Sequence, residues 1–353
     1  MLVPPEFFTQ RVGFGRGIFH GPLNYNLTRK PENLPIAYKH TVLIYNPRAG
    51  KLGKHGGALI DRAVEILRGQ GHNVETAPTT APGVAGELAR EHIARGADLI
   101  VAAGGDGTIN EIVQGMVHTK VPLAILPGGT ANVLSMEMLL GRSLIRAANR
   151  LNEMRPHRIA VGHLTGDNGR VSRYFLLMAG LGLDAHIVYH VSAGLKAIAG
   201  KLAYWVAGGS VLGRNLPSFR VEAAGQVRDC SFALVSRVRN YGGDFEIARS
   251  VSLFDRDFEV VLFEGRNSLS FVKYVAGMTL NRLKEMKGVT VLRSDQISVS
   301  CADDDRAYVQ IDGELAGQLP AEIRIVPDAL TLLIPPEYED KMKPAKFKGG
   351  KIA

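Results

Sequence analysis

The sequence contains little cysteine, a single tryptophan and no long apolar run. Cys230 and Cys301 are its two cysteines, and neither lies in a CxxC pair, which argues against a disulfide framework and against a cysteine-rich metal site. No run of about 18 apolar residues occurs, so no transmembrane helix is expected. The first residues, 1–8, lack the basic and then apolar order of a secretory signal. These absences predict a globular protein of the reducing cytoplasm.

The remaining composition is that of a large folded chain with a moderate positive charge. At 353 residues, with 46% hydrophobic and 22% charged residues, the chain is expected to form two domains. A net charge of +8 suits an anionic partner such as a nucleotide or an acidic lipid surface. Nucleic acid is not an expected partner, because the basic residues are not interleaved with aromatic residues.

Both ends of the chain differ from the body. Residues 1–40 are rich in Pro, Gly and Asn and predict an irregular extension. Residues 336–353 predict a basic flexible tail, whose lysines are Lys341, Lys343, Lys346, Lys348 and Lys351. Such a tail is either simply solvated or a weak tether to an acidic membrane, at roughly 1 kcal/mol per basic residue.

Between residues 41 and 155, strand-like and helix-like segments alternate. Strand patterns are found at 41–46, 73–76, 99–103 and 122–126, and helical patterns at 59–67, 84–94, 108–117 and 131–140. Strict alternation with short connections predicts a doubly wound parallel sheet covered by helices on both faces. Ligands of such sheets bind at the carboxyl ends of the strands.

From residue 156 to residue 335 strand-like segments follow one another without a helix after each. They are 173–178, 219–223, 231–238, 258–263, 296–301, 308–311, 322–326 and 330–334. This pattern predicts an antiparallel β-sandwich. Two apolar helical insertions are expected, around 195–212 and 269–286.

Gly104–Thr108 is a glycine-rich turn between an apolar strand and an amphipathic helix. Glycines let backbone N–H groups approach a phosphate closely, and the following helix N-terminus favours negative charge. Asp106 in this turn would hold a metal ion or accept a proton. The alternative is a tight turn in which Asp106 only caps a helix.

Two further turns are expected at the same edge of the sheet. Asn46–Lys51 follows the first strand, and Pro127–Asn132 is a second glycine turn with a hydroxyl at Thr130 and an amide at Asn132. Neither turn fits the P-loop or the dinucleotide-binding glycine pattern. Together the three turns predict a site for nucleotide phosphates.

Acidic and histidine residues in the second half offer further candidates. Asp312 and Glu314 would share one strand face and could share metal or base duty, although a hairpin turn is the favoured interpretation of these residues taken alone. Asp184 would hold a substrate hydroxyl or cap a helix. His186 and His190 have the i, i+4 spacing of zinc ligands but lack a third ligand, so ordinary core or surface histidines are favoured.

The ordered set of motifs resembles the lipid kinases of the diacylglycerol kinase and sphingosine kinase superfamily, especially the soluble bacterial type. The matching segments are Asn46–Lys51, Gly104–Glu111, Pro127–Asn132, Gly180–Asp184 and Ile311–Glu314, which span about residues 41–335. The resemblance implies an ATP-binding α/β domain at 41–155, a β-rich lipid-substrate domain at 156–335, and an active site in the cleft between them.

The resemblance also implies roles for particular residues. ATP would be bound by Asn46, Lys51, Thr80, Gly104, Gly105, Gly107, Thr108, Gly128, Gly129, Thr130, Asn132 and Lys201. Mg²⁺ would be held by Asp106 and Glu314. Asp312, supported by Glu314, would be the base on the lipid hydroxyl, with Asp106 as the other candidate. Asp184 would lie on the substrate side.

Two positions depart from the family pattern. Val133 stands where many members have Asp, which removes a metal-linked carboxylate. Phe254–Asp257 replaces the Asp-Asp-Gly of many bacterial members, so the residues of an auxiliary magnesium site are altered there.

The function implied is ATP- and Mg²⁺-dependent transfer of the γ-phosphoryl group to a hydroxyl of diacylglycerol, a sphingoid base or a related lipid. The enzyme would be cytoplasmic and would meet its lipid by peripheral contact with the inner face of the membrane. The alternatives are an NAD kinase, which also uses a GGDGT turn, and a non-catalytic nucleotide- or lipid-binding protein on the same frame. The sequence selects neither the lipid nor the oligomeric state.

Overall fold

The computed structural model describes most of the chain from residue 37 onward. The described residues are 37–53, 56–182, 217–241, 245–265, 274, 277, 282–301 and 307–343. The extension predicted at 1–40 lies outside them up to residue 36, as does the helical insertion predicted at 195–212. Of the insertion predicted at 269–286, only Tyr274, Gly277 and the segment from Arg282 onward are described.

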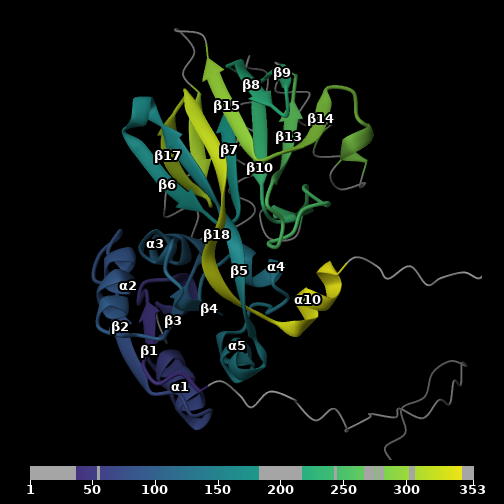
Figure 1. Cartoon of the computed structure of the whole chain (residues 1–353). Helices are drawn as coiled ribbons and strands as arrows, with labels where there is room; N and C mark the ends of the chain where they lie inside the picture. Colours follow the sequence, from purple (N-terminus) through teal and green to yellow (C-terminus); the bar gives the residue numbers. More distant parts are fainter. Residues whose placement is uncertain are drawn as a thin grey trace, which may run out of the picture. The chain divides into compact units, whose positions relative to one another are not determined.

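The first half of the chain forms the predicted parallel sheet. Its strands are β1 (Thr41–Tyr45), β2 (Val74–Pro78), β3 (Leu99–Gly104) and β4 (Pro122–Pro127). They lie in the order β2-β1-β3-β4 and all neighbours are parallel. Every residue of β3 is buried, because helices cover the sheet (Figure 1).

Helices pack on this sheet in two pairs. α1 (Gly56–Gly69) packs against α5 (Leu144–Asn149), and α2 (Ala85–Ala94) packs against α3 (Asp106–Met116). The α2–α3 pair is close because Gly86 and Gly115 face each other. A Cβ at Gly115 would lie 2.0 Å from the carbonyl oxygen of Gly86, so only glycine fits this crossing.

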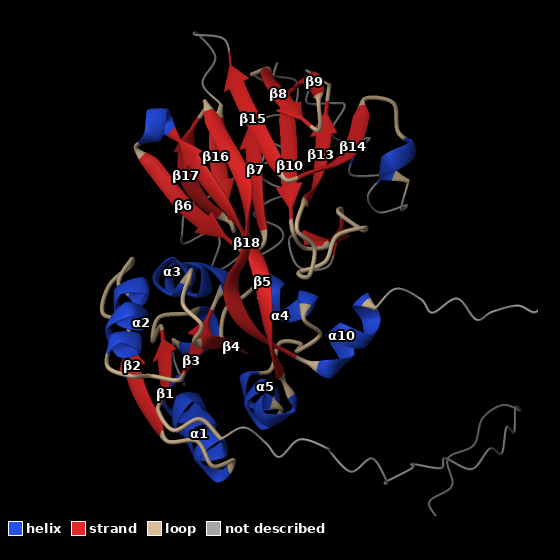
Figure 2. Ribbon diagram, in the orientation of Figure 1, coloured by secondary structure: helices blue, strands red, loops and turns tan. Residues whose placement is uncertain are grey.

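One long strand joins the two halves of the fold. β18 (Ala321–Ile334) pairs parallel with β4 through Thr331 and Leu332, while its first residues pair antiparallel with β15 (Gln296–Cys301). β5 (Arg155–Gly166) runs antiparallel along β18 (Figure 2). The two strands predicted at 322–326 and 330–334 are therefore one strand, interrupted only by a bulge.

The second half forms the predicted antiparallel sandwich. One layer is the continuation of the first sheet, in the order β4-β18-β15-β8-β9, and the other is a six-stranded sheet in the order β14-β13-β10-β7-β16-β17. Phe175, Phe258 and Ile323 belong to the apolar core between the layers. The remaining strands are β6 (Val171–Phe175), β7 (Met178–Gly182), β8 (Phe219–Ala223), β9 (Gln226–Cys230), β10 (Phe232–Ser236), β11 (Asn240–Tyr241), β12 (Phe245–Glu246), β13 (Phe258–Phe263), β14 (Val289–Ser294), β16 (Tyr308–Ile311) and β17 (Glu314–Gln318).

The segment after β18 corrects the prediction of a flexible tail from residue 336. Pro336–Met342 forms helix α10, and Tyr338 is fully buried. The Tyr338 hydroxyl donates to Glu137 Oε1 at 3.2 Å and accepts from the N–H of Leu253 at 3.0 Å. The aromatic anchor orders this first part, and the lysine-rich residues 344–353 lie outside the described chain.

The other helical elements are short. They are α4 (Val133–Glu137) and the 3₁₀ turns η1 (Gly50–Leu52), η2 (Leu151–Glu153), η3 (Asp167–Gly169) and η4 (Leu283–Glu285). Among the residues that the structure describes, no helix is long and apolar enough to cross a bilayer.

Candidate functional site

A cavity of about 430 Å³ opens at the carboxyl ends of the parallel strands. It is lined by Asn46, Arg48, Ala49, Gly50, Thr79, Thr80, Ala81, Pro82, Gly105, Gly107, Thr108, Glu111, Gly129 and Glu314. All three predicted turns contribute to this wall. Glu314 comes from β17, so the sandwich half supplies part of the wall as well.

The turn after β1 is held by its own asparagine. Asn46 Oδ1 accepts a hydrogen bond from the N–H of Arg48 at 2.9 Å, which leaves the Arg48 side chain exposed at the cavity. Lys51 lies in η1, and its side chain is outside the described part of the structure. Thr80, from the loop after β2, also lines the cavity.

The two glycine turns touch through their backbones. The N–H of Gly128 donates to the carbonyl oxygen of Gly104 at 2.8 Å, and a Cβ at Gly129 would lie 2.5 Å from the Cα of Gly105. Gly105 is the N-cap of α3 and offers no capping side chain. The first N–H groups of α3 therefore face a place where an anion can replace a cap.

Asn132 braces the second glycine turn from within. It is buried with a φ of 51°, its Oδ1 accepts from the N–H of Gly129 at 2.8 Å, and its Nδ2 donates to the Gly129 carbonyl at 2.9 Å. Thr130 is exposed beside this turn, next to Gly50. Asn132 thus shapes the turn with its amide, while the Thr130 hydroxyl remains at the surface.

Asp106 uses its carboxylate within the fold. Oδ2 accepts from the N–H of Val133 at 3.0 Å and Oδ1 from the N–H of Leu134 at 3.2 Å, so the side chain caps the N-terminus of α4. Burial raises the pKa of Asp106, and these N–H groups act in the opposite direction. Its neighbours Gly105 and Gly107 line the cavity, whereas Asp106 ties the start of α3 to the start of α4.

Asp312 and Glu314 do not share a strand face. Asp312 and Gly313 have φ values of 49° and 86° and form the two-residue turn between β16 and β17, which is the hairpin that was the alternative reading. Because the chain reverses between them, the two carboxylates point to different surroundings. The alternation of side chains along a strand does not apply across a turn.

The Asp312 carboxylate is buried and fully engaged. Its oxygens accept from the N–H groups of Leu176, Leu177 and Met178 at 2.9–3.0 Å and from Asn110 Nδ2 at 2.8 Å. Burial raises the pKa of Asp312 and the four donors counteract that rise. The residue therefore fixes the connection between β6 and β7 and joins it to α3.

Glu314 lines the cavity, and hydrogen bonds connect its carboxylate to Arg173 and Asn110. Arg173 Nη2 donates to Glu314 Oε2 at 3.0 Å and to Asn110 Oδ1 at 3.1 Å. The other oxygen of Glu314 lies close to Gly107, where a Cβ would come within 2.6 Å of it. Asn110 links this arrangement to Asp312, so both carboxylates are held by one network.

The sequence interpretation missed several residues of this site. Arg48, Glu111 and Arg173 were not among the predicted site residues, and Asn110 was counted only as part of the glycine turn. Glu111 lines the cavity and accepts from the N–H of Ala85 at the start of α2 at 3.3 Å. Helical spacing could have identified Glu111, because it follows Gly107 by one turn of α3 and lies on the same face of the helix.

Other predicted site residues lie outside the described part of the chain. They are Asp184, His186, His190 and Lys201. The altered segment around Asp255 is described, and its carboxylates pair with the guanidinium group of an arginine. Arg293 contacts Asp257 and also Asp255, the latter at 2.8 Å.

Two segments of the sequence match known domain families. Residues 40–164 match the diacylglycerol kinase catalytic domain, and residues 178–334 match the YegS C-terminal NAD kinase beta sandwich-like domain. Together with the parallel sheet and the antiparallel sandwich, the matches define a two-domain α/β plus β protein. The chain belongs to the family of proteins that join a diacylglycerol kinase catalytic domain to this C-terminal domain.

Individual relatives agree with this assignment. The chain is 28% identical over 312 residues to a diacylglycerol kinase of Bacillus subtilis, a match covering 86% of this chain and 99% of the relative. It is 27% identical to a diacylglycerol kinase of Mycobacterium tuberculosis, covering 80% of this chain and 87% of that protein. The crystal structure of a putative diacylglycerol kinase from Bacillus anthracis superposes with a TM-score of 0.73 at 22% identity, covering 87% and 99% of the two chains, and shows the shared fold.

Proposed function

We propose that this protein is an ATP- and Mg²⁺-dependent lipid kinase that phosphorylates a lipid hydroxyl, with diacylglycerol as the first substrate to test. The observation that carries the proposal is the cavity where two glycine turns and the uncapped start of α3 meet the Glu314 carboxylate. The names of the relatives, which match over most of the chain, support the same reaction.

The ATP phosphates would lie against the backbone of the glycine turns. Gly105 and Gly129 let the two loops touch beside the first turn of α3. Because the N–H groups of Gly128 and Gly129 donate to Gly104 and Asn132, the N–H groups of Gly107 and Thr108 at the start of α3 would meet the phosphates. Arg48 adds a positive charge and Thr80 a hydroxyl at the cavity wall. This arrangement binds phosphate by fixed dipoles that need no rearrangement when ATP arrives.

The residues present fit a magnesium ion bound together with the phosphates. Glu111 and Glu314 both line the cavity, and carboxylate oxygens are the ligands that Mg²⁺ prefers in proteins. When bound, Mg²⁺ would neutralise charge on the transferred phosphoryl group. Asp106 would support the site indirectly, since its carboxylate caps α4.

Glu314 would be the base, and Asp312 a positioning residue. In the reaction the lipid oxygen bonds to the γ-phosphorus, the bond from that phosphorus to the β,γ-bridging oxygen breaks, and the hydroxyl proton passes to Glu314 Oε1. Arg173 holds Oε2 and so orients the carboxylate. Asp312 acts through Asn110, which also contacts Arg173.

The lipid would reach the cavity from a membrane surface by peripheral contact. The positive net charge of +8 suits an acidic membrane. Deletion of residues 344–353 tests how much the terminal lysines contribute to membrane binding. The truncated chain should bind anionic vesicles more weakly, while unchanged binding would remove the tail from the proposal.

A phosphate-transfer assay tests the function directly. The full chain is incubated with ATP labelled at the γ-phosphate, Mg²⁺ and either diacylglycerol in mixed micelles or NAD. Labelled phosphatidic acid is the expected product. Labelled NADP without lipid phosphate would replace this proposal by NAD kinase, the activity in the name of the matched C-terminal domain family. ATP binding with neither product would indicate a non-catalytic binding protein.

The Glu314→Gln variant then tests the base. It should lower kcat by roughly 10²–10⁴-fold, because general-base catalysis contributes about that much. Glu322→Gln is the matched control, since Glu322 is an exposed strand residue that accepts from Ser298 far from the cavity. Equal kcat values for the two variants would exclude Glu314 as the base.

A further inference from the structure

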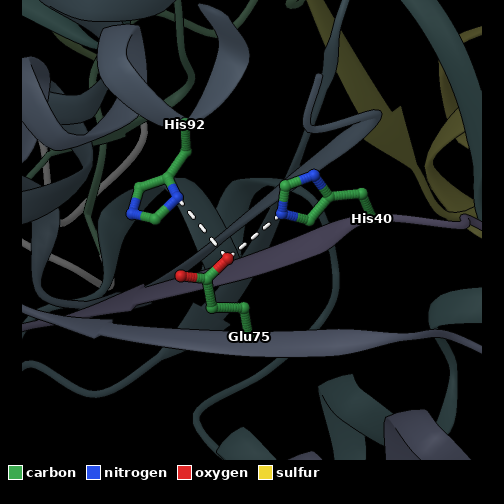
Figure 3. A group of neighbouring side chains, drawn as sticks. All are labelled: His40, Glu75 and His92. Atoms are coloured by element: carbon green, nitrogen blue, oxygen red, sulfur yellow. Dashed lines mark hydrogen bonds and ion pairs between the residues drawn. The ribbon is translucent and has the colours of Figure 1, made fainter. Parts of the chain in front are cut away.

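A second group of ligand-type side chains lies at the opposite, amino end of the parallel sheet. His40 directly precedes β1, Glu75 is the second residue of β2, and His92 lies in the last turn of α2. Figure 3 shows the two imidazole rings on either side of the Glu75 carboxylate, both directed at it. Three elements that are distant in sequence thus place one side chain each at a common point.

The distances match those of a metal site. His40 Nε2 lies 3.1 Å and His92 Nδ1 3.7 Å from the same oxygen, Glu75 Oε2. One ligand atom from each residue lies within 4.8 Å of the others. Zn²⁺ binds nitrogen and oxygen at about 2.0–2.2 Å in a tetrahedron, which separates neighbouring ligand atoms by about 3.4 Å.

His92 supplies an independent indication of a ligand. The residue is only 5% exposed, and its Nδ1 is a buried atom without a hydrogen-bond partner. A buried imidazole nitrogen normally has a partner, as His72 shows at the same end of the sheet. His72 Nδ1 accepts from the N–H of Tyr38 at 3.1 Å, and Nε2 contacts Asn152 Oδ1 at 2.8 Å.

The backbone at His40 is held in place by a neighbouring carboxylate. Asp98 accepts from the backbone N–H groups of Lys39 and His40 at 2.8 and 2.9 Å, which fixes the chain at His40. A carboxylate oxygen between two imidazole nitrogens is a ready set of ligands.

We propose that His40, Glu75 and His92 form a binding site for Zn²⁺ or a similar transition-metal ion. Two imidazole nitrogens favour Zn²⁺ over Mg²⁺ or Ca²⁺, which prefer oxygen ligands. Glu75 is half exposed, so water completes the coordination from the solvent side. The ion would tie the entry of β1 to β2 and α2, at the end of the sheet remote from the glycine turns.

Metal titration of the untagged full chain tests the proposal. ZnCl₂ is titrated by calorimetry, and CoCl₂ is added separately to follow visible absorption. One Zn²⁺ per chain, a Co²⁺ spectrum of low-symmetry coordination and a raised Tm in the presence of Zn²⁺ are expected. His92→Gln and His40→Gln should each weaken Zn²⁺ binding by roughly tenfold or more.

Two control variants keep the test specific. His157→Gln removes a histidine that contacts a single glutamate, Glu339, at 2.7 Å and should leave Zn²⁺ affinity unchanged. The double variant His186→Gln/His190→Gln removes the i, i+4 pair and should also leave it unchanged. Absence of binding by the parent chain would overturn the proposal, as would binding that survives His92→Gln or is lost in the His186/His190 variant. Kinase activity measured in parallel keeps this result separate from the proposed function.

Discussion

The two ends of the parallel sheet present opposite kinds of chemistry. The carboxyl end is built from backbone, with Gly105 and Gly129 in contact and α3 beginning without a capping side chain. The amino end is built from side chains, with His40 and His92 facing Glu75. A glycine-lined surface suits a large anion, whereas a compact nitrogen and oxygen cluster suits a single cation.

This difference explains why one end is visible in the sequence and the other is not. Backbone approach requires several glycines in a row, which leaves a contiguous signature such as Gly104–Thr108. Three side-chain ligands need only one residue from each element, so their signature is scattered over 53 positions from His40 to His92. Only the pairing of β1 with β2 and the packing of α2 bring them together.

The largest effect is expected from Gly129→Ala at the carboxyl end. A Cβ there would lie 2.5 Å from the Cα of Gly105, so the two turns must separate and ATP affinity should fall by roughly 100-fold or more. Gly57→Ala is the control, because Gly57 is exposed in α1 with open space around it. Calorimetric titration with an ATP analogue and Mg²⁺ measures both. Equal ATP affinities of the two variants would show that the contact between Gly105 and Gly129 is not needed for ATP binding.

Asp312→Asn should destabilise the protein without removing a cavity residue. An amide would present N–H groups to donors from Leu176, Leu177 and Met178, so about 1–3 kcal/mol of unfolding free energy or more should be lost. Glu314→Gln should leave the unfolding free energy within about 0.5 kcal/mol. Urea denaturation measures both variants. If Asp312→Asn retained full stability, the carboxylate would not be a positioning group.

His72 is a second buried histidine at the amino end of the sheet, in addition to His92. Burial lowers its pKa, so below the unfolded value of about 6.5 the unfolded chain binds the proton that the folded chain excludes. The free energy of unfolding therefore decreases as the pH falls below about 6.5. The loss between pH 7.5 and 5.5 should be smaller in His72→Gln than in the parent chain, measured by urea denaturation at each pH. A steeper loss in the variant would contradict this assignment.

The smallest effect is expected from Arg48→Gln. Arg48 is exposed at the cavity wall, where a single screened charge contributes about 0.5–1 kcal/mol. The KM for ATP should rise two- to fivefold, and the rise should shrink at high salt. Arg62→Gln on the exposed face of α1 should leave KM unchanged. A change in kcat with constant KM would show that Arg48 acts on the reaction rather than on binding.

The predicted fold was confirmed, and some strands were placed to the residue. β13, β15 and β16 have the predicted bounds because apolar residues either fill these strands or, as in β15, alternate with polar ones. β5 was missed, since Pro156, Gly162 and two histidines interrupt its pattern and pairing with β18 and β6 fixes it. β18 was divided in two because Pro327-Asp328 resembles a turn, and the structure accommodates these residues in a bulge with a positive φ at Asp328.

The candidate site was predictable where backbone geometry determines it. Gly105, Gly107 and Gly129 line the cavity, as their turns indicated. The surroundings of the acidic residues were not predictable, because a carboxylate has the same appearance in sequence whether it faces a ligand or the backbone. Asp106 caps α4 and Asp312 binds three N–H groups, while Glu314 alone of the three lines the cavity in the described chain.

Hydrogen exchange of the full chain with an ATP analogue and Mg²⁺ reports nucleotide binding at both ends of the sheet in one measurement. The account predicts slower exchange in peptides covering residues 46–50, 104–108 and 128–130 at the carboxyl end. Peptides covering 38–41, 73–76 and 90–94 at the amino end should be unchanged. Protection confined to the amino end, or none at the glycine turns at saturating nucleotide, would contradict the assignment of the cavity as the ATP site.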